Sequence, residues 1–168
     1  MTGPFTCDTV VGTMDSETIL LSVNPFIKGH ISTEYGYVLF GRMWNKSEIE
    51  LVTKQLSDRQ VDFIWNLFDS SHGDVGTSKE IFTPIEDFST PEKESFEKDL
   101  DFIIAAIKNG KKVFVHCFAG KGRTSLGLAS ILVRMGMDKE EALMTVYEAA
   151  HGPETETQKN FVKSLDSY

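Results

Sequence analysis

The chain has 168 residues, of which 40% are hydrophobic and 25% charged, and its formal net charge is −8 at pH 7. This composition excludes a disordered or fibrous chain, and the length predicts a single domain over residues 1–168 that buries about 70% of its unfolded surface. The negative charge argues against nucleic acid or an anionic membrane as a partner, because both attract basic surfaces.

The first half of the chain is predicted to contain one helix and several strands. The helix has Ser47 as its N-cap and Glu50 in the capping-box position, and it ends near Asp58. The turn-rich segment NPFIKGH is expected to join the first two strands. The third strand is almost continuously apolar, which is typical of a parallel sheet covered on both faces. The predicted strands are residues 18–23, 37–40, 61–68 and 80–85.

The second half is predicted to alternate helices with a short strand at residues 113–115. Thr90 and Pro91 occupy the preferred N-cap and first positions of a helix that ends before Gly110, and Asp138 caps a later one. Strands that alternate with helices predict an α/β fold, a central mostly parallel sheet flanked by helices, with its ligand site at the carboxyl ends of the strands. The helix residues expected to face the core are Phe96, Leu100, Ile103, Ile104, Ile107, Ala142, Leu143, Val146, Tyr147, Phe161, Val162 and Leu165.

The segment VFVHCFAGKGRT at residues 113–124 places a tight loop between that strand and an apolar helix at residues 125–135. Backbone N–H groups in such a loop point inward at the positive end of the helix macrodipole, and glycines let an oxyanion approach closely. Arg123 can add a bidentate guanidinium. The predicted phosphate-binding residues are Phe118, Ala119, Gly120, Lys121, Gly122 and Arg123.

Cys117 lies at the base of this loop, where the field that attracts an anion also favours the thiolate. We therefore expect a nucleophile that is ionised near neutrality without a separate base, and we expect His116 to assist through its dipole or a hydrogen bond. The alternative is a buried cysteine that merely ends a core strand. That alternative gives no reason for two glycines and an arginine at this spacing.

The segment HCFAGKGRT resembles the signature of the cysteine-dependent protein tyrosine phosphatases: His, Cys, five residues, Arg and Thr. The short chain favours the dual-specificity branch, and TPIEDFSTP followed by a helix and the loop is similar to small members such as the kinase-associated phosphatases. The similarity extends over roughly residues 81–165 and implies a phosphotyrosine phosphatase-like fold. Ser125 stands where many members carry glycine.

The resemblance implies a two-step hydrolysis of phosphate monoesters, foremost of phosphotyrosine in proteins, with phosphoserine and phosphothreonine as further candidates. Cys117 would form a phosphocysteine while Arg123 clamps the phosphate oxygens. Thr124 would assist departure of the thiolate in the second step; its alternative role is to cap the helix. Gln158 would orient the hydrolytic water, and its alternative is a solvated position in the last helix.

The resemblance also implies a general acid on a loop that precedes the strand, and Asp87 in PIEDFSTP occupies that place. Glu86 is the alternative, since adjacent side chains on an extended segment point to opposite sides and only one of the two faces the pocket. A solvated turn without a catalytic role is the third reading. Asp69 and Asp74 are expected to form turns in the earlier loop DSSHGDVG.

Other functions are weighed on the same residues. The sequence AGKGRT, which contains Lys121, is shared with the phosphatase and tensin homologue, so a phosphoinositide or inositol phosphate substrate is the alternative; there, however, a basic residue replaces Phe118. A sulfurtransferase or arsenate reductase does not account for the residues around Cys117. A non-catalytic phosphate-binding module has no reason to keep Cys117, Arg123 and Asp87 together.

Two cysteines, Cys7 and Cys117, are too few for a disulfide framework and indicate a reducing compartment. Cys7 is expected to be a small buried or terminal residue, with a reversible disulfide to Cys117 as the alternative. The first residues do not resemble a signal peptide, and no apolar stretch is long enough to span a bilayer. We expect a cytoplasmic monomer whose partner is a phosphorylated protein or peptide, without stable membrane association.

The remaining histidines and aromatic residues give weaker signals. His30, His72 and His151 lack the spacing of metal ligands, so neither a metal nor another cofactor is expected. Aromatic residues of the first sixty positions are expected in the core, with a place at the pocket border or in partner binding as the alternative. They are Phe26, Tyr35, Tyr37 and Trp44.

Overall fold

In the computed structural model, which describes residues 24–167, five strands form one sheet in the order β1-β2-β5-β3-β4. The strands β1 and β2 pair antiparallel, whereas the β2–β5, β5–β3 and β3–β4 pairs are parallel, so the expected mostly parallel sheet is confirmed. The strands are β1 (Ile27–Thr33), β2 (Gly36–Arg42), β3 (Phe63–Asn66), β4 (Lys79–Phe82) and β5 (Val113–Cys117).

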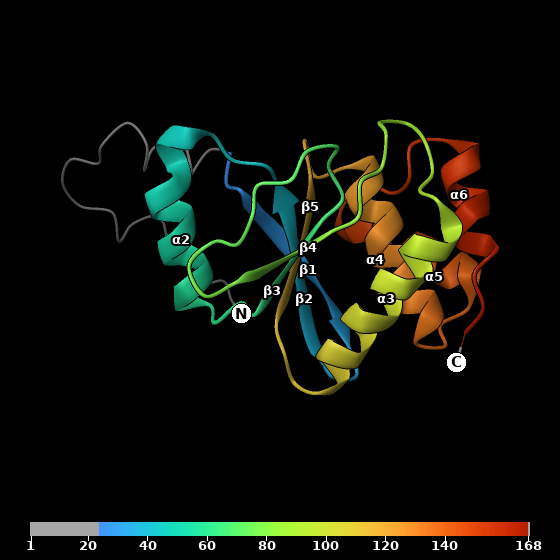
Figure 1. Ribbon diagram of the computed structural model, residues 1–168. Coiled ribbons are helices and arrows are strands. Elements are labelled where there is room, and N and C mark those ends of the chain that lie inside the picture. Colours follow the sequence, from blue (N-terminus) through green and yellow to red (C-terminus); the bar gives the residue numbers. More distant parts are fainter. Residues whose placement is uncertain (1–23, 168) are drawn as a thin grey trace.

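Helices cover both faces of this sheet (Figure 1). One face packs against α2, and the other is covered by α3, α4, α5 and α6. The expected α/β fold is therefore confirmed. The helices are the 3-10 turn η2 (Lys46–Glu48), α2 (Ile49–Asp58), α3 (Lys93–Lys108), α4 (Gly122–Arg134), α5 (Lys139–Ala149) and α6 (Glu156–Lys163).

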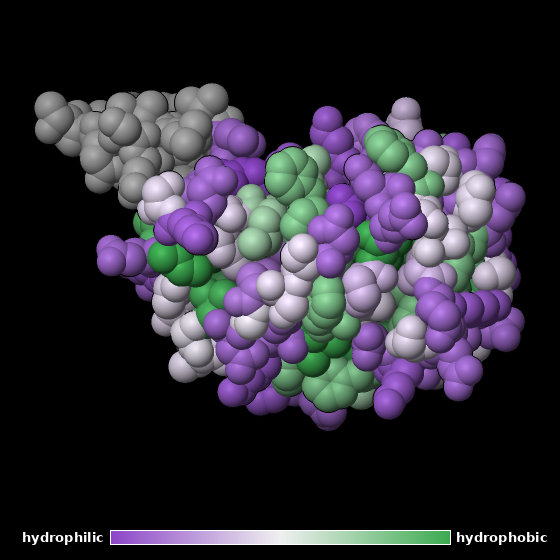
Figure 2. Space-filling view, turned by 45° about the horizontal axis from the view of Figure 1, so that its top comes forward, coloured by the Kyte–Doolittle hydropathy of each residue, from purple (hydrophilic) through white to green (hydrophobic). Residues whose placement is uncertain are grey.

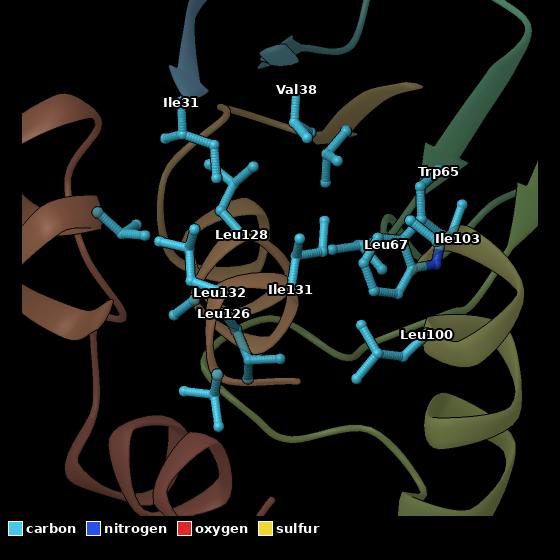
Figure 3. Packing of buried hydrophobic residues seen from close by; sticks show 14 of the residues in the cluster. Ile31, Val38, Trp65, Leu67, Leu100, Ile103, Leu126, Leu128, Ile131 and Leu132 are labelled. Atoms are coloured by element: carbon cyan, nitrogen blue, oxygen red, sulfur yellow. The ribbon is translucent and has the colours of Figure 1, made fainter. Parts of the chain in front are cut away.

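The larger core surrounds α4, every residue of which is buried (Figure 3). Leu126, Leu128 and Ile131 meet side chains of the sheet on one side and of α3, α5 and α6 on the other. A helix enclosed on all sides cannot shift without opening the core, because packed interiors tolerate few voids. The start of α4, and with it the loop that precedes it, is thus fixed in place.

Several local predictions are confirmed. The apolar face of α3 is buried at each of its five expected positions. Asp138 caps α5, where its carboxylate accepts hydrogen bonds from the N–H groups of Glu140 and Glu141. Val162 and Leu165 are buried, and Phe161 packs partly buried against the same core. Capping and helical periodicity act over a few residues, which explains why sequence alone predicted them.

Other local predictions were wrong. The segment NPFIKGH is no turn, because residues from Ile27 onward form β1, in which Ile31 is buried opposite Val38. The helical segment begins two residues earlier than expected, with Asn45 rather than Ser47 as the N-cap. The third helix starts later, at the cap Glu92, whose carboxylate accepts the N–H groups of the first turn.

Three tyrosines predicted for the core are exposed, and some predicted features lie outside the described residues. Tyr147 of α5 is 67% exposed, since that helix buries only a narrow stripe. Phe26 and Trp44 are buried as expected, whereas Tyr35 and Tyr37 are exposed. The strand expected at residues 18–23 and Cys7 are not among the described residues. Within residues 24–167, no helix is long and apolar enough to cross a membrane.

Candidate active site

The loop at residues 117–122 leaves the carboxyl end of β5, next to the end of β2, and enters α4. Gly120 has φ of +76°, and a Cβ there would lie 2.5 Å from the carbonyl oxygen of Gly41. Only glycine fits such a close backbone approach with a positive φ. The N–H of Met43 also donates to the carbonyl of Phe118 at 3.0 Å, which ties the loop to the segment after β2. The loop is therefore held by the sheet on one side and by α4 on the other.

Cys117 is buried at the base of this loop, and its sulfur has a specific partner. The hydroxyl of Thr124 donates to the Sγ atom at 3.0 Å. Thr124 is the third residue of α4, whose N-cap Lys121 makes no side-chain capping bond, so the predicted alternative that Thr124 caps the helix is wrong. A hydroxyl in this position stabilises negative charge on sulfur.

The side chain of Arg123 is buried and oriented by three neighbours. Its Nη1 donates to the carbonyl of Ile85 at 3.0 Å, its Nη2 lies 3.6 Å from Oδ1 of Asp87, and its guanidinium lies 5.4 Å from the ring centroid of Phe68. Its Nε is buried and has no hydrogen-bond partner among the described residues. A buried donor without a partner is costly, and Arg123 also lines the adjacent cavity, so its guanidinium is suited to an acceptor that binds there.

A cavity of about 230 Å³ opens above the loop. Asp87 lines it and Glu86 does not, which favours the predicted choice between these adjacent acids; Phe88, which follows, has φ of +59°. Figure 2 brings the top of the view in Figure 1 forward. On this face, small patches of hydrophobic residues lie among hydrophilic side chains. The lining residues are Asp87, Phe88, Cys117, Phe118, Ala119, Lys121, Gly122, Arg123 and Glu154.

Two residues of this region were missed by sequence reasoning. Glu154 lines the cavity, and its carboxylate accepts the N–H of Gly122 at 3.2 Å, at the start of α4. Lys28 of β1 donates from Nζ to the carbonyl of Ala119 at 2.7 Å. Lys28 and Ala119 are 91 positions apart in the sequence, and no local pattern brings them together.

The loop gathers positive charge in an otherwise acidic protein. The pKa of Lys28 is lowered, first by its partial burial and then by the neighbouring charges of Lys121 and Arg42. Repulsion among these cations and Arg123 falls when an anion binds between them. Positive charge is therefore concentrated at the loop, and two of these four cations, Lys28 and Arg42, come from strands that lie far from the loop in sequence.

His116 and Gln158 take different places. His116 is fully buried behind the loop, with Nδ1 3.2 Å from the carbonyl oxygen of Cys117. Gln158 is buried rather than solvated: its Oε1 accepts the N–H groups of Glu154 and Thr155, and its Nε2 donates to the carbonyl of Ser89. Gln158 is not among the described residues that line the cavity, so it joins the Asp87 loop to the Glu154 turn and does not reach the cavity itself.

The loop side chains divide into buried and exposed ones. Phe118 is 62% exposed and lies against Phe68, with ring centroids 5.6 Å apart. Lys121 is exposed at the cavity rim.

The described residues contain no cluster of His, Cys, Asp and Glu side chains that could hold a metal ion.

This geometry matches a known family. The model of Tc-R-P, described as "Polymorphic toxin system, DSP-PTPase phosphatase", matches residues 40–137, more than half of the chain. The chain belongs to this family. The resemblance predicted from the HCFAGKGRT signature is confirmed, including its dual-specificity branch.

Curated relatives agree over part of their length. The tyrosine-protein phosphatase yvh1 of Schizosaccharomyces pombe is 31% identical over 126 residues, which cover 73% of this chain and 37% of that protein. The uncharacterized protein MJECL20 of Methanocaldococcus jannaschii is 33% identical over 82 residues, 49% of this chain and 56% of that one. The chain thus spans about half or less of the length of these relatives.

Solved structures share the fold more completely. The active form of Tk-PTP is similar with a TM-score of 0.66 and 28% identity, and the match covers 78% of this chain and 92% of that one. A kinase associated phosphatase aligns with the same score at 17% identity, over 76% of this chain and 84% of that one. PTPMT1 in complex with PI(5)P has a TM-score of 0.66 at 16% identity, over 80% of this chain and 92% of that one. The last two likenesses concern the fold alone.

Proposed function

We propose that this protein hydrolyses phosphate monoesters, foremost phosphotyrosine in proteins, through a phosphocysteine on Cys117. The observation that carries the proposal is that Arg123 lines the same cavity as Cys117 and has a buried Nε without a hydrogen-bond partner among the described residues. A guanidinium held by Ile85 and Asp87 has a donor left for the equatorial oxygens of phosphate.

In the first step, the sulfur of Cys117 forms a bond to phosphorus while the bond to the leaving oxygen breaks. Asp87 gives its proton to that oxygen. Arg123 and the loop N–H groups predicted to point inward stabilise the charge on the transferring group, which is usually the largest contribution in reactions of this kind. Because these donors are fixed by the sheet and α4, little reorganisation is needed at the moment of transfer.

In the second step, water attacks phosphorus and passes a proton to the carboxylate of Asp87. The bond between sulfur and phosphorus breaks, and the hydroxyl of Thr124, 3.0 Å from Sγ, stabilises the departing thiolate. Gln158 supports this step indirectly, since its amide holds the Asp87 loop through Ser89. Glu154, the second carboxylate at the cavity, is the competing candidate for the acid.

The rim favours an aromatic ester. Phe88 and Phe118 line the cavity and are 58% and 62% exposed, so their rings are free to pack against the ring of a phosphotyrosine. Lys121 at the same rim supports the alternative, a phosphoinositide or inositol phosphate whose further phosphates would need a cation. The two substrate classes differ in which rim residue they require.

The test is phosphate release from phosphotyrosine peptides, phosphothreonine peptides, phosphoinositides and inositol phosphates by wild type, Cys117→Ser and the matched control Cys7→Ser. We expect phosphotyrosine peptides to be hydrolysed fastest, Cys117→Ser to be inactive but still bind them, and Cys7→Ser to retain activity. A wild-type protein that binds phosphopeptides without releasing phosphate would refute the enzyme. A preference for inositol phosphates that Lys121→Ala abolishes would establish the alternative.

A further inference from the structure

Two histidine rings contact each other behind the loop. Nε2 of His116 lies 2.9 Å from Nε2 of His72, which belongs to the segment between β3 and β4. Both are shielded: His116 is fully buried, and the side chain of His72 is 8% exposed. Trp44 packs on both, with centroid distances of 4.7 Å to His72 and 5.1 Å to His116. The pair is part of the protein interior.

The partners of His116 define its protonation. Nδ1 lies 3.2 Å from the carbonyl oxygen of Cys117, which can only accept, so Nδ1 carries the hydrogen. Burial lowers the pKa of His116 to about 3, against the hydrogen bond to Cys117, and the ring is neutral at pH 7. Its Nε2 is therefore an acceptor. The hydrogen between the two rings must come from His72.

The other nitrogen of His72 is also a donor. Nδ1 lies 2.6 Å from the carbonyl oxygen of Gly73 and 3.3 Å from Oε2 of Glu80, and both of these atoms only accept. A ring with hydrogens on both nitrogens is an imidazolium. Donation from both nitrogens would make His72 an imidazolium, which in the protein interior requires a counter-ion.

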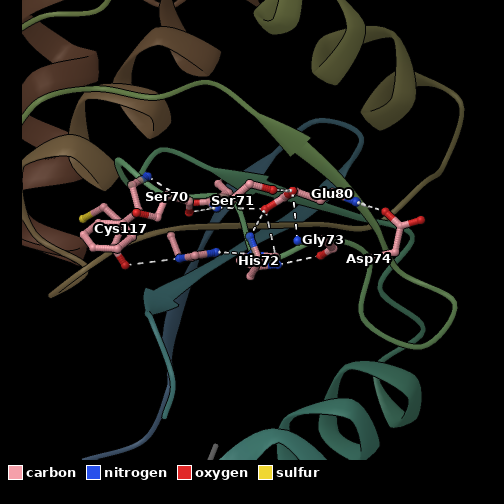
Figure 4. A network of polar contacts seen from close by, with 10 residues as sticks. Ser70, Ser71, His72, Gly73, Asp74, Glu80 and Cys117 are labelled. Atoms are coloured by element: carbon pink, nitrogen blue, oxygen red, sulfur yellow. Dashed lines mark hydrogen bonds and ion pairs between the residues drawn. The ribbon is translucent and has the colours of Figure 1, made fainter. Parts of the chain in front are cut away.

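Glu80 of β4 is that counter-ion, and its side chain is 7% exposed. Burial opposes its ionisation, but hydrogen bonds from the hydroxyl of Ser71, the amide of Asn66 and the N–H of His72 outweigh it and hold its pKa below the usual value. Figure 4 shows this network running from Glu80 through His72 toward Cys117. The hydrogen bonds that stabilise the carboxylate of this pair thus lie on the side away from His116.

The geometry points to Glu80 and His72 as positioning residues for Cys117: charged His72 locks His116 in its Nδ1–H form, which fixes the Cys117 peptide and favours the thiolate. Each donor in the series points toward the cysteine, from His72 to His116 and from His116 to the carbonyl of Cys117. This inference rests on the proposed function, because the positioning of Cys117 has a catalytic role only if its sulfur is the nucleophile.

The charged groups around this series are few. Among the described residues, His72 and Glu80 are the ionisable side chains that act on His116. Asp74 accepts the backbone N–H of Glu80 and pairs with Lys79 at 3.3 Å on the exposed side. A pH effect on Cys117 that passes through His116 must therefore originate in the pair of His72 and Glu80.

The first test needs no variant of the network. Long-range ¹H–¹⁵N correlation spectra of the full chain near pH 7 report the protonation of each imidazole nitrogen. We expect His72 to be protonated on both nitrogens and His116 on Nδ1 alone, with the assignment made by loss of signals in His72→Gln. A neutral His72, or His116 protonated on Nε2, would overturn the inference.

The second test measures the sulfur itself in a Cys7→Ser background. The rate at which iodoacetamide alkylates Cys117 is followed against pH for His72→Gln, for Glu80→Gln and for the two combined. We expect the midpoint of the rate curve to rise by about one pH unit in each, with about tenfold slower alkylation well below the midpoint, because each variant lacks the positive charge at residue 72 that holds His116 in its Nδ1–H form. The double variant should be no worse than either single one, because both changes remove the same interaction.

The control is His30→Gln, the same substitution at an exposed histidine of β1, which should leave the midpoint unchanged. Midpoints equal to wild type in folded His72→Gln and Glu80→Gln would refute the positioning role; if a variant does not fold, the spectra of the wild type still decide. Neither readout requires turnover. A protein with the expected spectra and midpoints but no phosphatase activity would refute the proposed function and leave this inference intact.

Discussion

Lowering the pH from 7 to 5 should destabilise this protein through His116 in particular. Burial lowers the pKa of His116 from 6.5 to about 3, so the folded chain keeps the ring neutral where the unfolded chain protonates it. A group whose folded pKa is depressed in this way takes up its proton on unfolding. Its contribution to stability is therefore present above pH 6.5 and is lost as the pH falls toward 3.

The size of the effect follows from proton linkage. With an unfolded pKa of 6.5 and a folded pKa of about 3, the free energy of unfolding should fall by about 2 kcal/mol between pH 7 and pH 5 on account of this one ring. Glu80 and Glu48 also have lowered pKa values, but their contributions are lost only at lower pH, near their ordinary value of 4.5 and below. These two carboxylates therefore contribute little between pH 7 and pH 5, and the comparison with His116→Gln separates the effect of this ring from that of the other histidines.

The assay is urea unfolding of wild type and His116→Gln at both pH values, with the free energy of unfolding extrapolated to water. The variant is expected to be less stable at pH 7, because a buried ring and its hydrogen bonds are lost. The comparison therefore uses only the change between the two pH values, which should be about 2 kcal/mol smaller in the variant. Equal changes in both proteins would show that the folded protein accommodates a protonated His116, and the reasoning would fail.

Three further substitutions test the loop and the acid. Asp87→Asn should lower kcat/KM about 10²–10³-fold for alkyl phosphates and far less for nitrophenyl phosphate, whose leaving group departs without a proton. Equal losses for both substrates would show that Asp87 is not the acid. The same selectivity in Glu154→Gln would assign that role to Glu154. Arg123→Lys should cost about 10²–10³-fold in phosphate release despite its retained charge, because a point charge cannot replace the planar fork, and near-normal activity would contradict the clamp. Gly120→Ala should lower the free energy of unfolding by about 1–3 kcal/mol, because residue 120 has a positive φ and lies close to the carbonyl oxygen of Gly41. The variant should also fail to bind vanadate. A stable variant that still binds vanadate would show that the loop has room for a Cβ.

Much of the framework could be predicted from sequence because it depends on neighbours along the chain. The apolar residues before Cys117, the glycines after it and the apolar helix that follows determine a strand, a tight loop and a buried α4. The spacing of apolar residues in α3 and the cap at Asp138 were likewise local signals. The segment that became β1 was misjudged, since a strand with Gly29 and few apolar residues is stabilised by pairing with β2 rather than by its own sequence.

The sequence by itself predicted the groups proposed to react and their order along the loop: Cys117, the backbone cradle, Arg123 and Thr124. Only the tertiary structure decided what surrounds them. Asp87 lines the cavity and Glu86 does not, while Lys28, Glu154 and the pair of His72 and Glu80 lie near the loop although they belong to strands and turns far away in the sequence. The physical reason is that a loop's conformation is governed by local backbone sterics, whereas its charge environment depends on long-range packing of the sheet.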